Sequence, residues 1–282
     1  MGYNSLMHLL NGKLLEEKDL VLPVRDLAIL RGYGVFDFFV TYNNRPFRLE
    51  DRMDRLYNSA EAIDLEIPIS KNEMKAWVLK AIDANPKLDE KMVKIVVTGG
   101  VSSNGFLPDG KPNIVIMVSP RHKPVAPEKY ETGIKVIADK FKRDISKAKT
   151  TDYIEAVRRA KQMREVGADE ILYFDDSQVY ECSKSNIWAL IEGKLVTPKT
   201  GVLLGITRKV LLEILKLAIP VSEEDFPLEQ LLGAQEVFMS SSNGEIIPIV
   251  QVDDKTIDKG KVGEITKEVM KQFKDYVESG EW

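Results

Sequence analysis

Several kinds of residue are scarce in this chain of 282 residues, and each scarcity excludes a class of protein. A single cysteine, Cys182, cannot form an intramolecular disulfide, which fits a reducing compartment. With two histidines and one cysteine, we expect no structural zinc site. No apolar run is long enough to span a membrane, and the first residues lack the basic and long apolar regions of a secretory signal. We therefore expect a cytoplasmic protein.

Charge of one sign is not in excess either. The formal net charge is −4, and acidic and basic residues are interspersed. A nucleic-acid-binding protein would be expected to carry a basic face, so we expect no nucleic acid partner. Hydrophobic residues make up 44% and charged residues 30%, as in an ordinary globular protein of one or two domains.

Helical and strand patterns are mixed along the whole chain. Asn11-Gly12 between two short apolar runs predicts a tight hairpin, and Ser70 with Glu73 has the spacing of a helix capping box. Residues 150–166 predict a helix with one apolar face, formed by Ile154, Val157, Ala160 and Met163. We expect an α+β fold in two domains. The expected boundaries are 1–118 for the N-terminal domain, 119–129 for a proline-rich linker and 130–282 for the C-terminal domain, which would carry Lys149.

Two residues near the middle of the chain have side chains suited to cofactor chemistry. Lys149 precedes the predicted helix, and Glu181 ends a predicted strand in front of small polar residues. An amine that forms an imine and a carboxylate that holds a ring nitrogen protonated are what pyridoxal phosphate (PLP) needs from a protein. Each residue taken alone is more often a structural or surface group, so the case depends on their surroundings.

Other residues are suited to binding a phosphate. Gly205-Ile206-Thr207 opens a predicted helix, where free backbone N–H groups and the helix dipole attract anions. A hydroxyl cluster, Ser240–Ser242, lies between two predicted strands, and Arg55 lies beside the apolar face of its helix. Taken one by one, these features also fit a helix cap, a turn and a surface ion pair.

Taken in order, these segments resemble a known family. They are Gly32–Asp37, Arg55–Leu56 with Ser59–Ala60, Lys149, Gly167–Leu172, Glu181–Asn186, Thr197–Pro198, Leu204–Arg208, and Glu236–Met239 leading into Ser240–Ser242. In this order and spacing they resemble the fold-type IV PLP enzymes, which include branched-chain aminotransferases, D-amino acid transaminases and aminodeoxychorismate lyases. The resemblance covers nearly the whole chain and implies a homodimeric PLP-dependent transaminase.

The resemblance also implies roles for individual residues. Lys149 matches the Schiff-base lysine, which moves the proton between Cα and C4′, and Glu181 matches the carboxylate that faces the pyridine nitrogen. The remaining cofactor contacts match Arg55, Ile206, Thr207, Ser241 and Ser242 for the phosphate, Leu203 for the ring face and Tyr153 for the 3′ oxygen. Phe36 stands where many relatives have an active-site tyrosine, so this chain lacks the tyrosine hydroxyl at that position.

The substrate-binding residues depart from the common patterns of the family. The arginine and histidine that bind the substrate carboxylate in typical D-amino acid transaminases are absent from Thr98–Phe106. Arg31 and Lys184 instead resemble two basic residues of an atypical D-amino acid transaminase subgroup. This implies amino transfer between a D-amino acid, such as D-alanine or D-glutamate, and 2-oxoglutarate. A branched-chain L-amino acid aminotransferase, an aminodeoxychorismate lyase and a non-catalytic phosphate-binding module remain alternatives.

Overall fold

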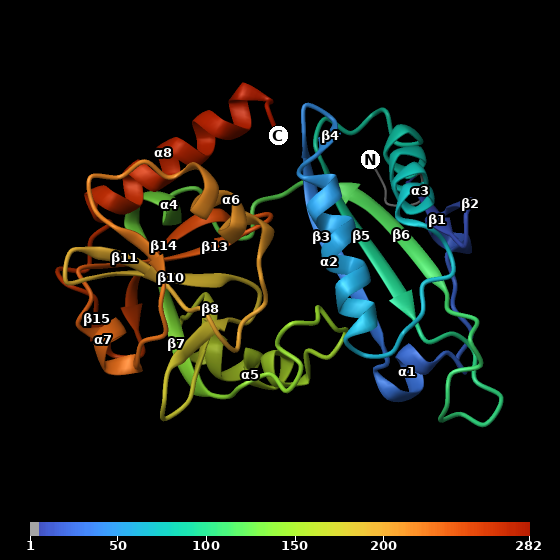
Figure 1. The fold of residues 1–282 in the computed structure, drawn as a ribbon, viewed down its shortest axis with the longest axis horizontal. Helices are drawn as coiled ribbons and strands as arrows, with labels where there is room; N and C mark the ends of the chain where they lie inside the picture. The colour runs from blue at the N-terminus through green and yellow to red at the C-terminus, as the bar shows by residue number, and fades with distance from the viewer. Residues whose placement is uncertain (1–5) are drawn as a thin grey trace. The chain divides into compact units, whose positions relative to one another are not determined.

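The computed structural model describes residues 6–282, which form two compact units (Figure 1). Unit 1 comprises residues 6–122 and 147–152, and unit 2 comprises residues 123–146 and 153–282. Both units combine helices with β-strands, so the predicted α+β class is confirmed. The first boundary lies inside the predicted linker. The segment 147–152, however, belongs to unit 1, whereas we predicted Lys149 in the C-terminal domain.

Unit 1 is built on a six-stranded antiparallel sheet with the strand order β2-β1-β6-β5-β3-β4. Its strands are β1 (Met7–Leu10), β2 (Lys13–Glu16), β3 (Gly34–Tyr42), β4 (Arg45–Pro46), β5 (Lys91–Thr98) and β6 (Ile114–Pro120). The predicted hairpin joins β1 to β2. Asn11 and Gly12 both have positive φ there, as a tight two-residue turn requires.

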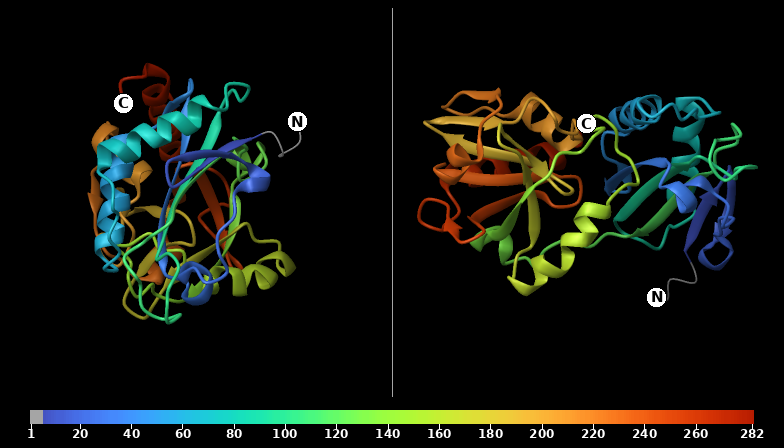
Figure 2. Two further views of the ribbon diagram at one scale, coloured as in Figure 1. Left: turned by 90° about the vertical axis from the view of Figure 1, so that its right-hand side faces the viewer. Right: turned by 90° about the horizontal axis from the view of Figure 1, so that it is seen from below.

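Two helices, α2 (Leu49–Glu61) and α3 (Lys71–Asp83), cover one face of this sheet (Figure 2). Met53 of α2 and Met74 of α3 are fully buried against it. Ser70 accepts a hydrogen bond from the Glu73 N–H, so the predicted cap of α3 is confirmed. The sheet and these two helices enclose the hydrophobic core of unit 1. The shorter elements are η2 (Glu17–Asp19) and α1 (Leu27–Arg31), neither of which was predicted.

The segment 147–152 lies along β3. The Phe36 N–H donates to the Lys149 carbonyl at 2.8 Å, and the Thr151 N–H donates to the Gly34 carbonyl at 3.0 Å. Val35 and Thr150 form an isolated β-bridge between these two hydrogen bonds. Because these backbone contacts join the segment to the first sheet, Lys149 is part of unit 1.

Unit 2 contains a nine-stranded sheet whose path of strands closes on itself. The order is β12-β11-β10-β13-β14-β7-β8-β9, with β15 beside β14 and a further pairing between β9 and β10. The strands are β7 (Ile134–Lys140), β8 (Glu170–Phe174), β9 (Val179–Cys182), β10 (Asn186–Ile191), β11 (Lys194–Thr197), β12 (Val221–Glu223), β13 (Glu236–Ser241), β14 (Glu245–Val252) and β15 (Lys255–Thr256). The closing pair joins Glu181 to Asn186, so the predicted cofactor-binding glutamate lies at the point of closure.

The helices of unit 2 are α4 (Lys129–Thr132), α5 (Ile154–Glu165), α6 (Ile206–Ile214), α7 (Leu228–Leu232) and α8 (Glu264–Ser279). The helices α6 and α8 contact each other, and both contact β13. No helix among residues 6–282 is long and apolar enough to cross a membrane.

The apolar face predicted for α5 is not the face that packs. Ile154 and Val157 are 75% and 72% exposed. Arg159 forms an ion pair with the buried carboxylate of Asp139 on β7, and Met163 packs on a small apolar cluster. The predicted helix is therefore confirmed, but the orientation predicted for its apolar face was wrong for Ile154 and Val157.

Buried charges join β3 to α2 in unit 1. The carboxylate of Asp37 is fully buried, and it accepts hydrogen bonds from Arg55 Nε at 2.8 Å and Arg55 Nη2 at 2.9 Å. Arg52 is also fully buried, and its Nη1 lies 3.9 Å from Asp37 Oδ1. Burial, together with the nearby charge of Arg55, lowers the pKa of Arg52 to about 9, and the charge of Asp37 opposes this shift. Arg52 therefore stays charged at neutral pH, and Asp37 compensates the charge of two arginines.

Replacing this carboxylate should destabilise the protein strongly. We expect Asp37→Asn to lower the free energy of unfolding by about 3 to 5 kcal/mol, because it removes the carboxylate that lies between two buried guanidinium groups. Urea unfolding followed by tryptophan fluorescence measures the change. Asp54→Asn, on α2, is the matched control. Its carboxylate is 61% exposed and pairs with Lys71, so this change should have little effect. Equal losses in the two variants would contradict the prediction.

Candidate active site

In unit 1, the backbone of Lys149 is held on both sides. The Lys149 N–H donates to Ser59 Oγ at 3.1 Å, and the hydroxyl of Ser59 donates to the Arg55 carbonyl at 2.7 Å. The Lys149 carbonyl accepts the hydrogen bond from Phe36. The Lys149 Nζ lies 4.6 Å from the centroid of the Phe36 ring, within the range of a cation–π interaction. The fold thus fixes the main chain of Lys149 and places its amine at an aromatic ring.

Arg55 shares this setting. Its side chain is 10% exposed, and Nε and Nη2 are occupied by Asp37. A guanidinium has five N–H donors, so the fork to Asp37 leaves donors for an anion. Since Ser59 connects the carbonyl of Arg55 to the backbone of Lys149, the structure brings the predicted residues Arg55, Phe36 and Lys149 together within unit 1.

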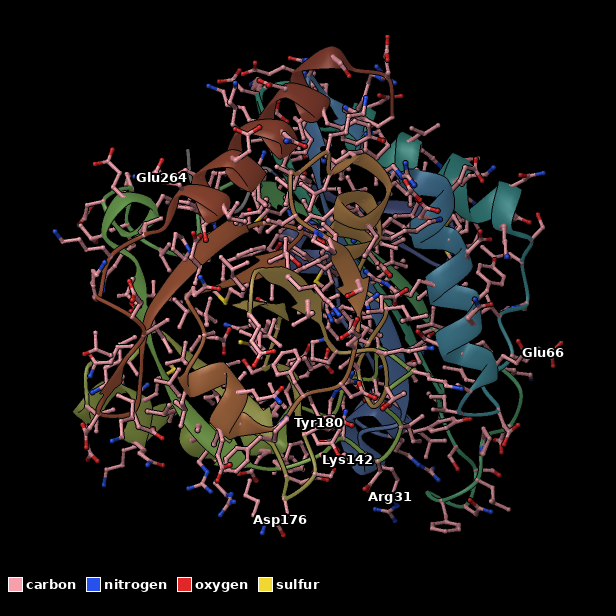
Figure 3. All side chains as sticks on the ribbon, turned by 60° about the vertical axis from the view of Figure 1, so that its left-hand side comes forward. Arg31, Glu66, Lys142, Asp176, Tyr180 and Glu264 are labelled. Carbon is pink, nitrogen blue, oxygen red and sulfur yellow. The ribbon has the colours of Figure 1, made fainter. Side chains whose placement is uncertain are left out.

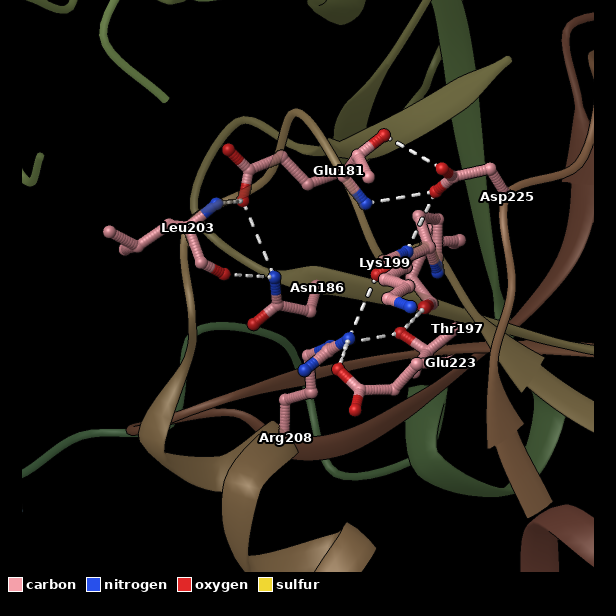
Figure 4. A network of polar contacts seen from close by, with 11 residues as sticks. Glu181, Asn186, Thr197, Lys199, Leu203, Arg208, Glu223 and Asp225 are labelled. Atoms are coloured by element: carbon pink, nitrogen blue, oxygen red, sulfur yellow. Dashed lines mark hydrogen bonds and ion pairs between the residues drawn. The ribbon is translucent and has the colours of Figure 1, made fainter. Parts of the chain in front are cut away.

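In unit 2, the carboxylate of Glu181 accepts hydrogen bonds from three residues, two of which Figure 4 shows. Arg143 donates to Oε1 from Nε at 2.9 Å and from Nη2 at 2.5 Å. The Leu203 N–H donates to Oε2 at 3.1 Å, and Asn186 Nδ2 donates to the same oxygen at 3.4 Å. Arg143 therefore supplies the counter-charge of Glu181, and all three residues fix the orientation of its carboxylate.

A ligand could take the place of Asn186 at this carboxylate. A carboxylate offers about four lone-pair positions, and the bond from Asn186 is the longest of the four given above. Asn186 Nδ2 also donates to the Leu203 carbonyl at 2.8 Å. A ring N–H that displaced Asn186 from Glu181 would therefore leave the Asn186 amide with a partner.

The N-terminus of α6 has the properties of an anion site. Gly205 precedes it and supplies no side-chain cap, and the side chain of Thr207 is buried. Within residues 6–282, Thr207 Oγ1 has no hydrogen-bond partner, which is rare for a buried hydroxyl. A Cβ on Gly205 would lie 1.9 Å from Asn186 Oδ1, so only glycine fits. A phosphate would satisfy both the hydroxyl and the free N–H groups of the first helical turn.

Arg208, the residue after Thr207, holds the start of α6 in place (Figure 4). Its buried guanidinium donates from Nη2 to the Pro198 carbonyl at 2.9 Å and to Glu223 Oε1 at 2.6 Å, and from Nε to Thr197 Oγ1 at 3.3 Å. These partners lie at or just beyond the ends of β11 and β12. Arg208 thus connects the anion site to the sheet.

The hydroxyls of the serine cluster make different contacts. Ser240 Oγ accepts a hydrogen bond from Trp188 Nε1 at 3.0 Å inside the core. Ser241 Oγ accepts one from the Gly244 N–H at 3.1 Å and so stabilises the turn after β13. The register of β10 and β13 pairs Asn186 with Ser240, which places the cluster next to the strand that carries Asn186. Ser240 therefore has a structural role, and Ser241 and Ser242 stay as predicted phosphate contacts.

The predicted substrate-binding cations lie in different units. Arg31 ends α1 in unit 1, and its exposed side chain points outward (Figure 3), with Nη1 donating to the Leu30 carbonyl at 2.8 Å. Lys184 is in unit 2 and is 66% exposed, and its Nζ lies 4.0 Å from Oε2 of the buried Glu170. Tyr153 occupies the N-cap position of α5. The roles predicted for these three residues remain predictions.

Sequence reasoning gave no role to several residues of these networks, among them Ser59, Arg143 and Asn186. Ser59 and Asn186 lay within motif segments but received no role. Arg143 lies in a basic run, which is typical of a solvated surface, and it precedes Glu181 by 38 residues. No sequence signal connected these two residues, because only the folding of the sheet brings them into contact.

Known proteins match the chain over most of its length. Residues 34–252 match the family model of amino-transferase class IV. A putative branched-chain-amino-acid aminotransferase of Methanocaldococcus jannaschii is 35% identical over 277 residues, which cover 94% of each chain. The D-alanine aminotransferase of Listeria monocytogenes serotype 4b is 34% identical over 275 residues, again 94% of each chain.

The fold is also similar to solved structures. A branched-chain aminotransferase of the thermophilic archaeon Thermoproteus uzoniensis, solved with norvaline, has a TM-score of 0.87 at 28% identity, over 98% of this chain and 96% of that one. The family model and the relatives confirm the resemblance inferred from the motifs, and this similarity confirms the fold. The chain therefore belongs to the class IV aminotransferases, the enzymes of fold type IV.

Proposed function

We propose that the protein is a PLP-dependent D-amino acid aminotransferase. It would move an amino group between a D-amino acid, such as D-alanine or D-glutamate, and a 2-oxo acid such as 2-oxoglutarate. The observation that carries the chemistry is the setting of Lys149, whose backbone is fixed beside Arg55 and whose amine lies at the ring of Phe36. The D-preference is supported by the relatives named D-alanine aminotransferase and by the cations Arg31 and Lys184.

Each unit by itself holds residues that suit a part of PLP. In unit 2, the hydroxyl of Thr207, which has no partner within residues 6–282, and the uncapped start of α6 suit its phosphate. Glu181, held by Arg143, suits its ring nitrogen. The other proposed contacts are Arg55, Ile206, Ser241 and Ser242 to the phosphate, Leu203 to the ring face and Tyr153 to the 3′ oxygen. When bound, PLP supplies an electron sink for the negative charge that forms on the substrate α carbon.

The residues of the chain have separate tasks in this reaction. The Lys149 amine would hold the cofactor covalently. Its Nζ would be the base that takes the proton from the substrate α carbon and the acid that returns it. Ser59 and Phe36 hold the Lys149 backbone while the side chain moves. Arg143 compensates the charge of Glu181, which can then keep the ring nitrogen protonated.

Covalent attachment of PLP to Lys149 can be tested directly. The purified protein should be yellow, and borohydride should bleach the colour and fix the mass of the cofactor on Lys149, as peptide mass spectrometry measures. Lys149→Ala should show no such adduct, and Lys147→Ala should behave as the wild type. Colourless protein that takes up no PLP, or an adduct on another lysine, would overturn the proposal.

Thr207 should contribute to PLP binding without contributing to stability. We expect Thr207→Val to weaken PLP affinity about 10- to 100-fold, the effect of losing one hydrogen bond to a charged phosphate. Its Oγ1 has no protein partner among residues 6–282, so the stability of the PLP-free protein should not fall. Absorbance titration with PLP and urea unfolding measure the two effects. Thr207→Ser keeps the hydroxyl and should restore the affinity, and unchanged affinity in Thr207→Val would refute the phosphate contact.

A panel of D- and L-amino acids decides the substrate class. With 2-oxoglutarate as acceptor, D-alanine should be converted in preference to L-leucine, and Arg31→Ala and Lys184→Ala should raise the KM for D-glutamate. Guanidinium and ammonium groups bind carboxylates, so each loss should weaken substrate binding. Unchanged KM values for D-glutamate and D-alanine in both variants would refute these two assignments.

The main alternative is a branched-chain L-amino acid aminotransferase. It is favoured by the Methanocaldococcus jannaschii relative, whose name describes that activity. Conversion of L-leucine in preference to D-alanine in the same panel would establish it, and release of pyruvate from aminodeoxychorismate would indicate the lyase. We also propose that the enzyme is a cytoplasmic homodimer, as the family resemblance implies.

A further inference from the structure

A loop of unit 2, residues 198–205, joins β11 to α6 and touches both parts of the candidate cofactor site in this unit. The Leu203 N–H donates to the carboxylate of Glu181, and Gly205 precedes the anion site at the start of α6. The loop therefore lies between the carboxylate that suits the ring nitrogen and the helix start that suits the phosphate. The groups that hold this loop also position those two parts of the site.

One carboxylate, that of Asp225, holds the first half of the loop (Figure 4). Its Oδ1 accepts hydrogen bonds from the backbone N–H groups of Lys199 at 2.8 Å and of Thr200 at 2.9 Å. Its Oδ2 accepts a hydrogen bond from the Thr200 hydroxyl at 2.7 Å. Hydrogen bonds to an ionised acceptor are stronger than those between neutral groups. Two of the three reach the main chain, so Asp225 fixes the path of the loop itself.

The backbone on both sides of Asp225 is fixed to the sheet of unit 2. The Glu224 N–H donates to the Thr197 carbonyl at the end of β11 at 3.0 Å, and the Val179 N–H of β9 donates to the Phe226 carbonyl at 2.9 Å. The side chain of Phe226 is buried in the core of this unit. These contacts attach the segment without the carboxylate of Asp225, which therefore serves the loop rather than its own segment.

The middle of the loop packs independently of Asp225. Gly201 has a positive φ, and a Cβ on it would lie 2.5 Å from a ring carbon of Tyr180. Val202 is buried in the small apolar cluster that contains Tyr180. Because these contacts remain when the carboxylate is removed, we expect a variant at Asp225 to fold and to loosen the loop only locally.

We propose that Asp225 is a positioning residue for the cofactor, because its carboxylate holds the loop that places Leu203 at Glu181 and Gly205 at the start of α6. The inference rests on the PLP chemistry of the proposed function and adds a residue that touches neither cofactor nor substrate. Leu203 follows Thr200 by three residues, so a displacement at Thr200 is passed to the Leu203 N–H. Coupling between two sites is reciprocal, so bound PLP should in turn stabilise the loop.

The first test measures PLP affinity by absorbance titration of the full-length protein freed of cofactor. We expect Asp225→Ala to weaken the affinity about 10- to 100-fold, because binding must then order the loop. Asp225→Asn should restore most of the affinity, since its amide oxygen accepts the two backbone N–H groups and its amide N–H can donate to the Thr200 hydroxyl. Glu224→Ala is the matched control, because this neighbouring exposed carboxylate pairs with Lys194 and Ser222 instead of the loop.

Hydrogen exchange separates a positioning role from a merely structural one. In the wild type, PLP should slow the exchange of the Lys199 and Thr200 amides, as mass spectrometry of a peptide that spans the loop measures. In Asp225→Ala without PLP, the loop should exchange faster, whereas the exchange of the β10 strand should not change. A merely structural role would lower stability throughout unit 2 and leave the PLP affinity of the folded protein unchanged.

The outcomes distinguish this inference from the proposed function. Unchanged PLP affinity in Asp225→Ala, or equal losses in Asp225→Ala and Glu224→Ala, would overturn the inference while the wild type still binds PLP. A wild type that takes up no PLP would overturn both. A wild type that binds PLP but converts no D-amino acid would overturn only the proposed function, and the PLP affinities would still decide the role of Asp225.

Discussion

The buried pair between Asp37 and Arg55 is the interaction on which the arrangement of unit 1 depends. The two hydrogen bonds of the guanidinium fix α2 against β3, and the next turn of that helix presents Ser59 to the backbone of Lys149. The segment 147–152, which carries Lys149, also pairs with β3 through the hydrogen bond from the Phe36 N–H. The carboxylate of Asp37 thus helps to position Lys149, because both elements that hold the backbone of Lys149 are joined at Asp37.

In unit 2, a hydrogen-bond network at the closure of the sheet positions the candidate cofactor-binding residues. Asn186 pairs across the strands with Glu181, donates to the carbonyl of Leu203 and lies against Gly205. The side chain of Asn186 therefore contacts both the carboxylate of Glu181 and the anion site at the start of α6. Because Gly205 has no Cβ, the start of α6 can approach the Asn186 amide closely. The carboxylate of Glu181 and the start of α6 therefore keep fixed positions relative to each other.

Local signals in the sequence predicted much of the fold. The Asn11-Gly12 turn and the Ser70 cap depend on residues a few positions apart, and both are confirmed. The helix α5 was also predicted, but the orientation predicted for its apolar face was wrong. Its apolar spacing was read correctly, but Arg159 meets Asp139 on a strand that the helical pattern does not reveal.

The sequence by itself determined the family, the elements and the chemical groups of the candidate site, such as Lys149 and Glu181, because these follow from residue type and from the order of short motifs. The tertiary structure decided which unit holds Lys149, that Arg143 compensates the charge of Glu181 and that Asp225 holds the loop 198–205. The physical reason is that strand register and helix rotation depend on contacts between distant segments. No local pattern encodes these contacts.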